Sequence, residues 1–154
     1  QRVYELADQT GAVCVSIRSE WILVDPETRH IMRPETFTAK KLGVCDKPID
    51  CPEPKKVLRP KEGREDRGSR MIRWSDLDGN GHVYSGNYGD IVWDALPEDL
   101  QERVPTEFYI NYSKEATLGQ ELRLGGFRDG QEYRMEGIGP QGTCFTALCV
   151  FAEQ

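Results

Sequence analysis

Ten residues decide the fold predicted for this chain: Trp74-Ser75-Asp76-Leu77-Asp78-Gly79-Asn80-Gly81-His82-Val83. They place acids, an amide and a histidine between glycines, directly before an amphipathic segment. Counted from Asp76, the acids at positions one and three, Asn80 at five and Gly81 at six match the opening of a calcium-binding EF-hand loop. The first interpretation to weigh is therefore a calcium site.

The flanks of the loop argue against calcium. Position twelve, where an EF-hand has a bidentate Glu, is Asn87. Residues 70–74 are expected to form a strand, whereas an EF-hand needs a helix before its loop. Calcium binding is the lesser alternative, and for the Asp76 side chain we expect a loop or capping role.

The same loop also suits catalysis. Asp78, Asn80 and His82 alternate, so an extended backbone would direct their side chains the same way. An acid orients a nearby imidazole and favours its protonated form. The N–H groups at the start of a following helix stabilise negative charge developing on a carbonyl oxygen. Without a serine nucleophile elbow, and with no cysteine beside His82, this predicts attack on an activated ester by water.

Hydrophobic periodicity predicts the surrounding elements. Apolar positions at helical spacing indicate a helix over residues 84–96, ended by Pro97, with a short second helix over 98–103. Strand patterns and turn signals predict strands at 2–7, 12–25, 70–74, 107–113, 121–127, 131–138 and 143–152. This order predicts the α+β class, with an antiparallel sheet wrapped around a central helix.

The chain divides into three predicted parts: a hairpin over 1–34, a Pro-rich linker over 35–68 and a globular unit over 69–154. Two strands alone are marginally stable, so the hairpin must pack on something else. The stretch from Lys55 to Arg73 is basic. We interpret it as a solvated linker, the alternative being a docking surface for an acidic partner.

Composition limits the classes of function. The 154 residues are 38% hydrophobic and 30% charged, as in ordinary soluble domains. A net charge of −6 argues against a nucleic-acid partner. The apolar runs are too short to cross a membrane, and no signal peptide opens the chain. Five cysteines without C-x-x-C spacing make zinc unlikely and favour a reducing, cytoplasmic location.

Three stretches carry a family resemblance. Arg73–Val83 resembles the second hotdog domain of acyl-acyl-carrier-protein thioesterases. Residues 107–116 are similar to the strand after the central helix, and Ser19–Asp25 with Thr28-Arg29 resembles the closing strand of the first hotdog. Three matches in the family's order are more specific than one loop, and the resemblance implies a hotdog fold.

The resemblance also implies an activity. A member would hydrolyse fatty acyl thioesters on acyl carrier protein and release free fatty acid for lipid metabolism, with no cofactor and no metal. The matching catalytic set is Asp78, Asn80, His82 and Glu115. In that set Glu115 and His82 activate water, Asp78 orients the site, and Asn80 positions the water or the thioester.

Trp74, Ser85 and Ile91 are the candidate substrate-binding residues, although core packing is the main role expected of most apolar side chains here. The family commonly has Asn-Asn where this chain has Tyr84-Ser85, which puts the substrate and the fine geometry of the site in question. Ser85 can still cap the helix.

The second departure from the family concerns the first hotdog, of which only the last hairpin is present. Either the chain is a fragment, or the hairpin joins the sheet of another subunit in a homo-oligomer. Two alternatives stay open on the same fold: an acyl-CoA thioesterase, and a non-catalytic hotdog half that binds acyl groups.

Overall fold

The computed structural model describes residues 1–25, 27–28, 30–33, 49–58 and 62–153. These residues form two compact units, Gln1–Pro54 and Lys55–Gln154. The boundary lies within the stretch assigned to a linker. Residues 35–48 and 59–61 of that linker fall outside the described part, as do Pro26, Arg29 and Pro34.

The N-terminal unit is built on an antiparallel hairpin of β1 (Arg2–Ala7) and β2 (Val13–Ser19). The Asp8 carboxylate closes the turn by accepting hydrogen bonds from the backbone N–H groups of Thr10 and Ala12. The predicted strand over 12–25 ends early, at Ser19. Its register explains the difference, because Ser19 pairs with Arg2 and β1 offers no further strand residue to pair with.

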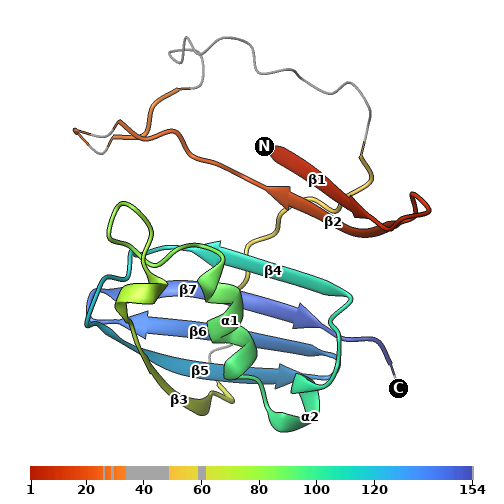
Figure 1. The fold of residues 1–154 in the computed structure, drawn as a ribbon. Coiled ribbons are helices and arrows are strands. Elements are labelled where there is room, and N and C mark those ends of the chain that lie inside the picture. The colour runs from red at the N-terminus through yellow and green to blue at the C-terminus, as the bar shows by residue number, and fades with distance from the viewer. Residues whose placement is uncertain (26, 29, 34–48, 59–61, 154) are drawn as a thin grey trace. The chain divides into compact units, whose positions relative to one another are not determined.

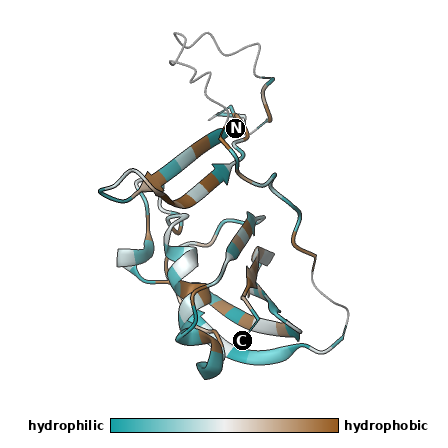
Figure 2. Ribbon diagram, turned by 90° about the vertical axis from the view of Figure 1, so that its right-hand side faces the viewer, coloured by the Kyte–Doolittle hydropathy of each residue, from teal (hydrophilic) through white to brown (hydrophobic). Residues whose placement is uncertain are grey.

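The hairpin has an apolar face that stays exposed. Figure 2 shows hydrophobic and hydrophilic residues alternating along both strands. Tyr4, Leu6, Val15 and Ile17 are all exposed, and the register pairs Tyr4 with Ile17 and Leu6 with Val15. Successive strand residues point to opposite faces, so these four share one face. The pattern agrees with a hairpin that cannot bury its own apolar surface.

The C-terminal unit is a five-stranded antiparallel sheet (Figure 1). Its strands are β3 (Glu65–Met71), β4 (Glu107–Tyr112), β5 (Glu121–Asp129), β6 (Glu132–Gly139) and β7 (Gly142–Val150). They are ordered β3-β5-β6-β7-β4. The first strand begins at Glu65, earlier than the predicted strand over 70–74, because Glu65 and Asp66 still pair with β5. The chain then leaves the sheet in a 3₁₀ helix over Trp74–Asp76.

Helix α1 (Asn87–Asp94) packs on one face of this sheet (Figure 1). Its buried residues Tyr88, Ile91 and Val92 join a core that includes Tyr133 and Phe145 of the sheet. Each such side chain contributes about 1.5–3 kcal/mol by leaving water. The helix is shorter than the predicted 84–96 because both ends tighten into i→i−3 turns. Helix α2 (Glu98–Gln101) follows, and no helix in the described part of the chain is long and apolar enough to cross a membrane.

Residues 55–57 cross the opposite face of the sheet and are held there by polar side chains. Asn111 of β4 accepts a hydrogen bond from the Val57 N–H at 2.6 Å and donates one to the Lys55 carbonyl at 3.2 Å. Thr146 of β7 donates to the Val57 carbonyl at 3.3 Å. Asn111 and Thr146 are cross-strand partners, and Glu136 is the next residue in that row. This part of the predicted linker is therefore bound to the domain.

Three arginines of the basic stretch make contacts inside the C-terminal unit. Arg64 binds Glu136, which is only 1% exposed, at 3.0 Å. A side chain at Gly125 would overlap the Arg64 guanidinium, so glycine permits this approach. Arg67 donates to the Ala95 carbonyl at 2.7 Å, and Arg70 pairs with a buried aspartate of the motif loop. These contacts weaken the alternative of a docking surface. Arg59 and Lys61 lie outside the described residues.

The described cysteines Cys14, Cys51, Cys144 and Cys149 are free thiols, and Cys45 lies outside the described residues. Cys144 and Cys149 are buried in β7, and burial raises the pKa of the Cys149 thiol to about 11. They therefore pack as small neutral apolar residues, as predicted from their position in a strand.

Candidate active site

The motif loop turns back on itself. The Asp78 N–H donates to the His82 carbonyl at 2.8 Å, and the Gly81 N–H donates to the Asp78 carbonyl at 3.1 Å. Gly81 has a φ of 78°, a left-handed conformation that favours glycine. Leu77 and Val83 pair across the base of the turn. The backbone over 78–82 is thus not extended, the condition under which the three side chains would point the same way, because Gly81 adopts the left-handed conformation of a tight turn.

Asp78 organises this turn through backbone contacts. Its Oδ1 accepts hydrogen bonds from the N–H groups of Asn80, at 2.8 Å, and His82, at 3.2 Å. These bonds, that from Asn80 foremost, hold the pKa of the Asp78 carboxyl below its usual value. Asn80 itself is exposed at the turn. The arrangement lets Asp78 fix the backbone from which the His82 side chain projects.

His82 and Glu115 meet although they are far apart in sequence. The Val83 N–H donates to the Ala116 carbonyl at 2.9 Å, and His82 pairs with Thr117 in an isolated β-bridge. These contacts hold the motif loop against the chain that follows β4. As a result, His82 Nε2 lies 3.1 Å from Glu115 Oε2. The His82 side chain is half-buried, and that of Glu115 is largely exposed.

A pocket of about 180 Å³ opens beside this pair. It is lined by His82, Val83, Ser85, Tyr88, Tyr112, Ser113, Lys114 and Glu115. The Tyr88 ring lies 5.4 Å from that of Tyr112 and 5.3 Å from that of Phe145. Burial raises the pKa of Tyr88 to about 12, so its hydroxyl stays neutral. Tyr88 and Tyr112 were not among the residues predicted from the sequence to bind substrate.

Ser85 contributes its carbonyl and not its hydroxyl. The residue that caps α1 is Gly86, with no side-chain hydrogen bond, so the expected capping by Ser85 is not made. The Tyr112 hydroxyl donates to the Ser85 carbonyl at 3.0 Å. This bond ties the end of β4 to the chain entering α1. The first turn of the helix is thereby held at the rim of the pocket.

Asp76 is a buried anchor beneath the loop, 5% exposed. Its Oδ1 accepts from Arg70 Nη2 at 2.9 Å and its Oδ2 from the Arg73 N–H at 2.7 Å. Its carbonyl accepts from the Tyr84 N–H at 2.8 Å and from Asn87 Nδ2 at 3.1 Å. The expected turn and capping role of Asp76 is confirmed, and the contact with Arg70 was not foreseen.

These contacts count against the calcium interpretation. The carboxylate at its first ligand position is already bound to a guanidinium and a backbone N–H. A strand and a 3₁₀ helix precede the loop, where an EF-hand has an α-helix. Within the described ranges, no three His, Cys, Asp or Glu side chains gather closely enough to hold a metal.

Two of the three predicted substrate-binding residues lie away from this pocket. Trp74, on the 3₁₀ helix, is 78% exposed. Ile91 is buried in the core on α1. Ser85 alone of the three lines the pocket. Of the predicted catalytic set, the structure brings His82 and Glu115 into contact. Asp78 binds the backbone N–H of His82, and Asn80 is exposed.

The family model of the acyl-ACP thioesterase C-terminal domain matches residues 61–136. A crystal structure of an acyl-ACP thioesterase from Bacteroides thetaiotaomicron matches with a TM-score of 0.81 and 22% identity. The match covers 97% of the present chain and 61% of the Bacteroides chain. No curated protein matches the sequence.

A second crystal structure, of a Lactobacillus plantarum protein described as an oleoyl thioesterase, matches with a TM-score of 0.67 and 18% identity. The match covers 98% of the present chain and 63% of the Lactobacillus chain. The present chain therefore spans less than two thirds of the length of either protein. At these identities the likeness shows the fold. The α+β hotdog prediction is confirmed, and so is the resemblance on which it rested.

Proposed function

We propose that this chain carries the water-activating site of a thioester hydrolase, in line with the match of residues 61–136 to the family model of the acyl-ACP thioesterase C-terminal domain. The observation that carries the proposal is the contact of His82 Nε2 with Glu115 Oε2 at 3.1 Å, on the wall of a pocket. An imidazole and a carboxylate at hydrogen-bonding distance can accept and return one proton, which is general acid–base catalysis.

In the proposed reaction, a water molecule in the pocket loses a proton to the Glu115–His82 pair. Its oxygen then bonds to the carbonyl carbon of the thioester. The C–S bond breaks as the tetrahedral intermediate collapses, and the pair returns the proton to the sulfur of the leaving thiol. The products are a free carboxylic acid and a thiol, and no group of the protein is acylated.

The first turn of α1 would stabilise the intermediate. Ser85 and Tyr88 flank the start of this helix and line the same pocket as the acid–base pair. Backbone N–H groups at a helix N-terminus favour negative charge. A carbonyl oxygen placed there would gain this stabilisation as it becomes an oxyanion, an effect worth about 2.7–4 kcal/mol for one donor in a well-studied hydrolase.

We assign roles to the remaining members of the motif on their contacts. Asp78 is a positioning residue, because its carboxylate holds the N–H of His82 and does not line the pocket. Asn80 would help to position the water or the thioester from its exposed place in the turn. The proposed substrate is a fatty acyl group on acyl carrier protein, in line with the family model that matches residues 61–136.

The test measures release of thiol and free acid from acyl-acyl carrier protein by the 154-residue chain. We expect His82→Ala and Glu115→Ala each to lower the rate by about 100-fold or more, since acid–base groups contribute typically 10²–10⁴. Glu153→Ala, an exposed carboxylate beyond β7, is the matched control and should keep full activity. Unchanged rates in both site variants, or no release by the chain itself, would contradict the proposal.

The same assay run with acyl-CoA separates the two thioester carriers. A rate that is higher with acyl-CoA would move the assignment to an acyl-CoA thioesterase with the same site. Saturable binding of both substrates without release of thiol would favour the non-catalytic, acyl-binding alternative.

A further inference from the structure

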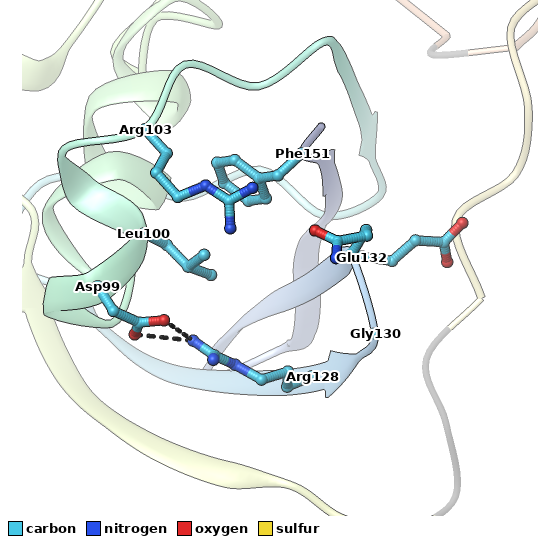
Figure 3. A pocket seen from close by; sticks show the side chains of 8 residues that line it. Asp99, Leu100, Arg103, Arg128, Gly130, Glu132 and Phe151 are labelled. Carbon is cyan, nitrogen blue, oxygen red and sulfur yellow. Dashed lines mark hydrogen bonds and ion pairs between the residues drawn. The ribbon is translucent and has the colours of Figure 1, made fainter. Parts of the chain in front are cut away.

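A second pocket lies at the other end of the helical segment. It has a volume of about 300 Å³ and is formed by α2, the turn between β5 and β6, and the chain after β7. Figure 3 shows side chains from these separate segments converging on it. It shares no lining residue with the pocket beside His82. Its volume falls at the lower end of the range for small-molecule sites.

The floor of this second pocket is apolar and well fixed. Leu100 of α2 and Phe151 are each buried in the core, 4% and 3% exposed. The Phe151 N–H donates to the Gln131 carbonyl at 2.9 Å, which anchors the chain after β7 to the β5–β6 turn. A hydrocarbon group entering the pocket would therefore meet a preformed surface.

Two arginines line the walls, and they differ in the groups that they contact. Arg128 Nη2 lies 2.8 Å from each carboxylate oxygen of Asp99, so that charge is neutralised locally (Figure 3). The Arg103 guanidinium lies 5.1 Å from the centre of the Phe151 ring and donates to the Ala152 carbonyl, a neutral acceptor. The positive charge of Arg103 is thus kept at the pocket.

The remaining acid on the lining does not cancel this charge. Glu132 pairs with Arg134, and its carboxylate points away from the pocket in Figure 3. Among the described residues, Arg103 forms no direct ion pair, although its charge also acts on Asp99. The pocket therefore combines the Arg103 cation with an apolar floor. Such a surface favours a ligand with an anionic head and a short hydrocarbon body.

We infer that this second pocket binds a small amphipathic carboxylate. Arg103 holds the carboxylate group, which a guanidinium matches with two parallel N–H donors. Leu100 and Phe151 cover the hydrocarbon, whose length is limited by the small volume. Free carboxylic acids are also the product class of the proposed hydrolysis, but this inference rests on the residues of the second pocket alone.

The test titrates the isotopically labelled chain with hexanoate and follows the amide signals of Leu100, Gln131 and Phe151 by NMR. Hexanol, which has the chain without the charge, and acetate, which has the charge with almost no chain, are the matched ligands. We expect hexanoate to shift these signals saturably and to bind at least tenfold more tightly than either control ligand. Absence of saturation, or equal binding of hexanol, would overturn the inference. This comparison of ligands needs no variant.

Two variants then locate the site. Arg103→Gln removes the charge at nearly constant size and should weaken hexanoate binding about tenfold or more. Arg123→Gln, on an exposed position of β5 outside the pocket, is the matched control. Unchanged affinity in folded Arg103→Gln would contradict the assignment. His82→Ala should leave hexanoate binding intact, so the outcome is separate from that of the hydrolysis test.

Discussion

The pocket beside α1 and the pocket beside α2 differ in the kind of charge they hold. The pocket beside α1 contains an imidazole and a carboxylate in contact, His82 and Glu115. The pocket beside α2 contains Arg103 and Arg128, whose side chains stay protonated at any working pH. The first pair can exchange a proton with a substrate, whereas in the second pocket Arg128 is paired with Asp99 and Arg103 can hold an anion. The smaller pocket therefore suits chemistry, while the larger one suits binding.

The strongest test of this difference measures the rate of hydrolysis in one variant of each pocket. Glu115→Gln keeps the size of the side chain and removes its basicity, so hydrolysis should fall about 100-fold or more. Arg103→Gln should leave hydrolysis within about twofold, because Arg103 lies outside the first pocket. Initial rates of thiol release from one acyl thioester measure both. A comparable loss in Arg103→Gln would show that the pockets are not independent.

A second prediction concerns Asp76, which supports the first pocket from below. Asp76→Asn would leave Arg70 without its anionic partner and weaken the cap on the Arg73 N–H. We expect the free energy of unfolding to fall by about 2–3 kcal/mol, since hydrogen bonds to charged groups contribute about 1.5–3 kcal/mol. Urea unfolding followed by tryptophan fluorescence measures the change.

Asp94→Asn serves as the matched control for that experiment, because Asp94 is an exposed acid at the end of α1. It should change the unfolding midpoint little. If Asp76→Asn were as stable as this control, the buried contact with Arg70 would not be the anchor of the loop.

Tyr112 gives a smaller and more specific test of the first pocket. Tyr112→Phe removes only the hydroxyl that holds the Ser85 carbonyl. A lost hydrogen bond of about 1 kcal/mol should lower kcat roughly fivefold and leave KM nearly unchanged. Tyr109→Phe is the matched control on the same strand, since that hydroxyl bonds to Glu107 and lines neither pocket. Equal effects of the two substitutions would show that the bond to Ser85 has no special role.

Local patterns in the sequence were sufficient to predict most of the sheet and α1, because alternation and helical spacing report directly on which face is buried. These patterns failed where contacts with another segment, or the conformation of one residue, determine where an element ends. The end of β2 depends on how far β1 extends, and the turn over 78–82 depends on the left-handed conformation of Gly81, which overrules simple alternation. Element ends set by such contacts are not visible in one segment alone.

The candidate site shows the same division between local and distant information. Nothing local in the sequence joins His82 to Glu115, and only the family resemblance placed Glu115 in the site. The structure supplies the physical link, a backbone hydrogen bond from Val83 to Ala116. The second pocket was not predicted, because Arg103, Arg128 and Phe151 come from three segments without a shared motif.

The smallest expected effect compares one aspartate from each region. The fold lowers the pKa of both Asp78 and Asp99 below the ordinary value of 3.8. For Asp78 the main cause is hydrogen bonding from backbone N–H groups, whereas for Asp99 it is the side-chain bond to Arg128. Each carboxylate therefore contributes stability above its unfolded pKa, near 3.8, and this contribution is lost as the pH falls through the folded value.

Salt should separate these two causes. The contact between Asp99 and Arg128 is an exposed ion pair, and at 1 M salt the screening length falls to about 3 Å. The pKa of Asp99 should then rise towards its ordinary value, while that of Asp78, held by backbone dipoles in direct contact, should move much less. Carboxyl ¹³C NMR titrations at low salt and at 1 M NaCl measure both groups in one sample. An equal shift at Asp78 would mean that net charge, and not the turn over 78–82, sets the ionisation of the carboxylate that positions His82.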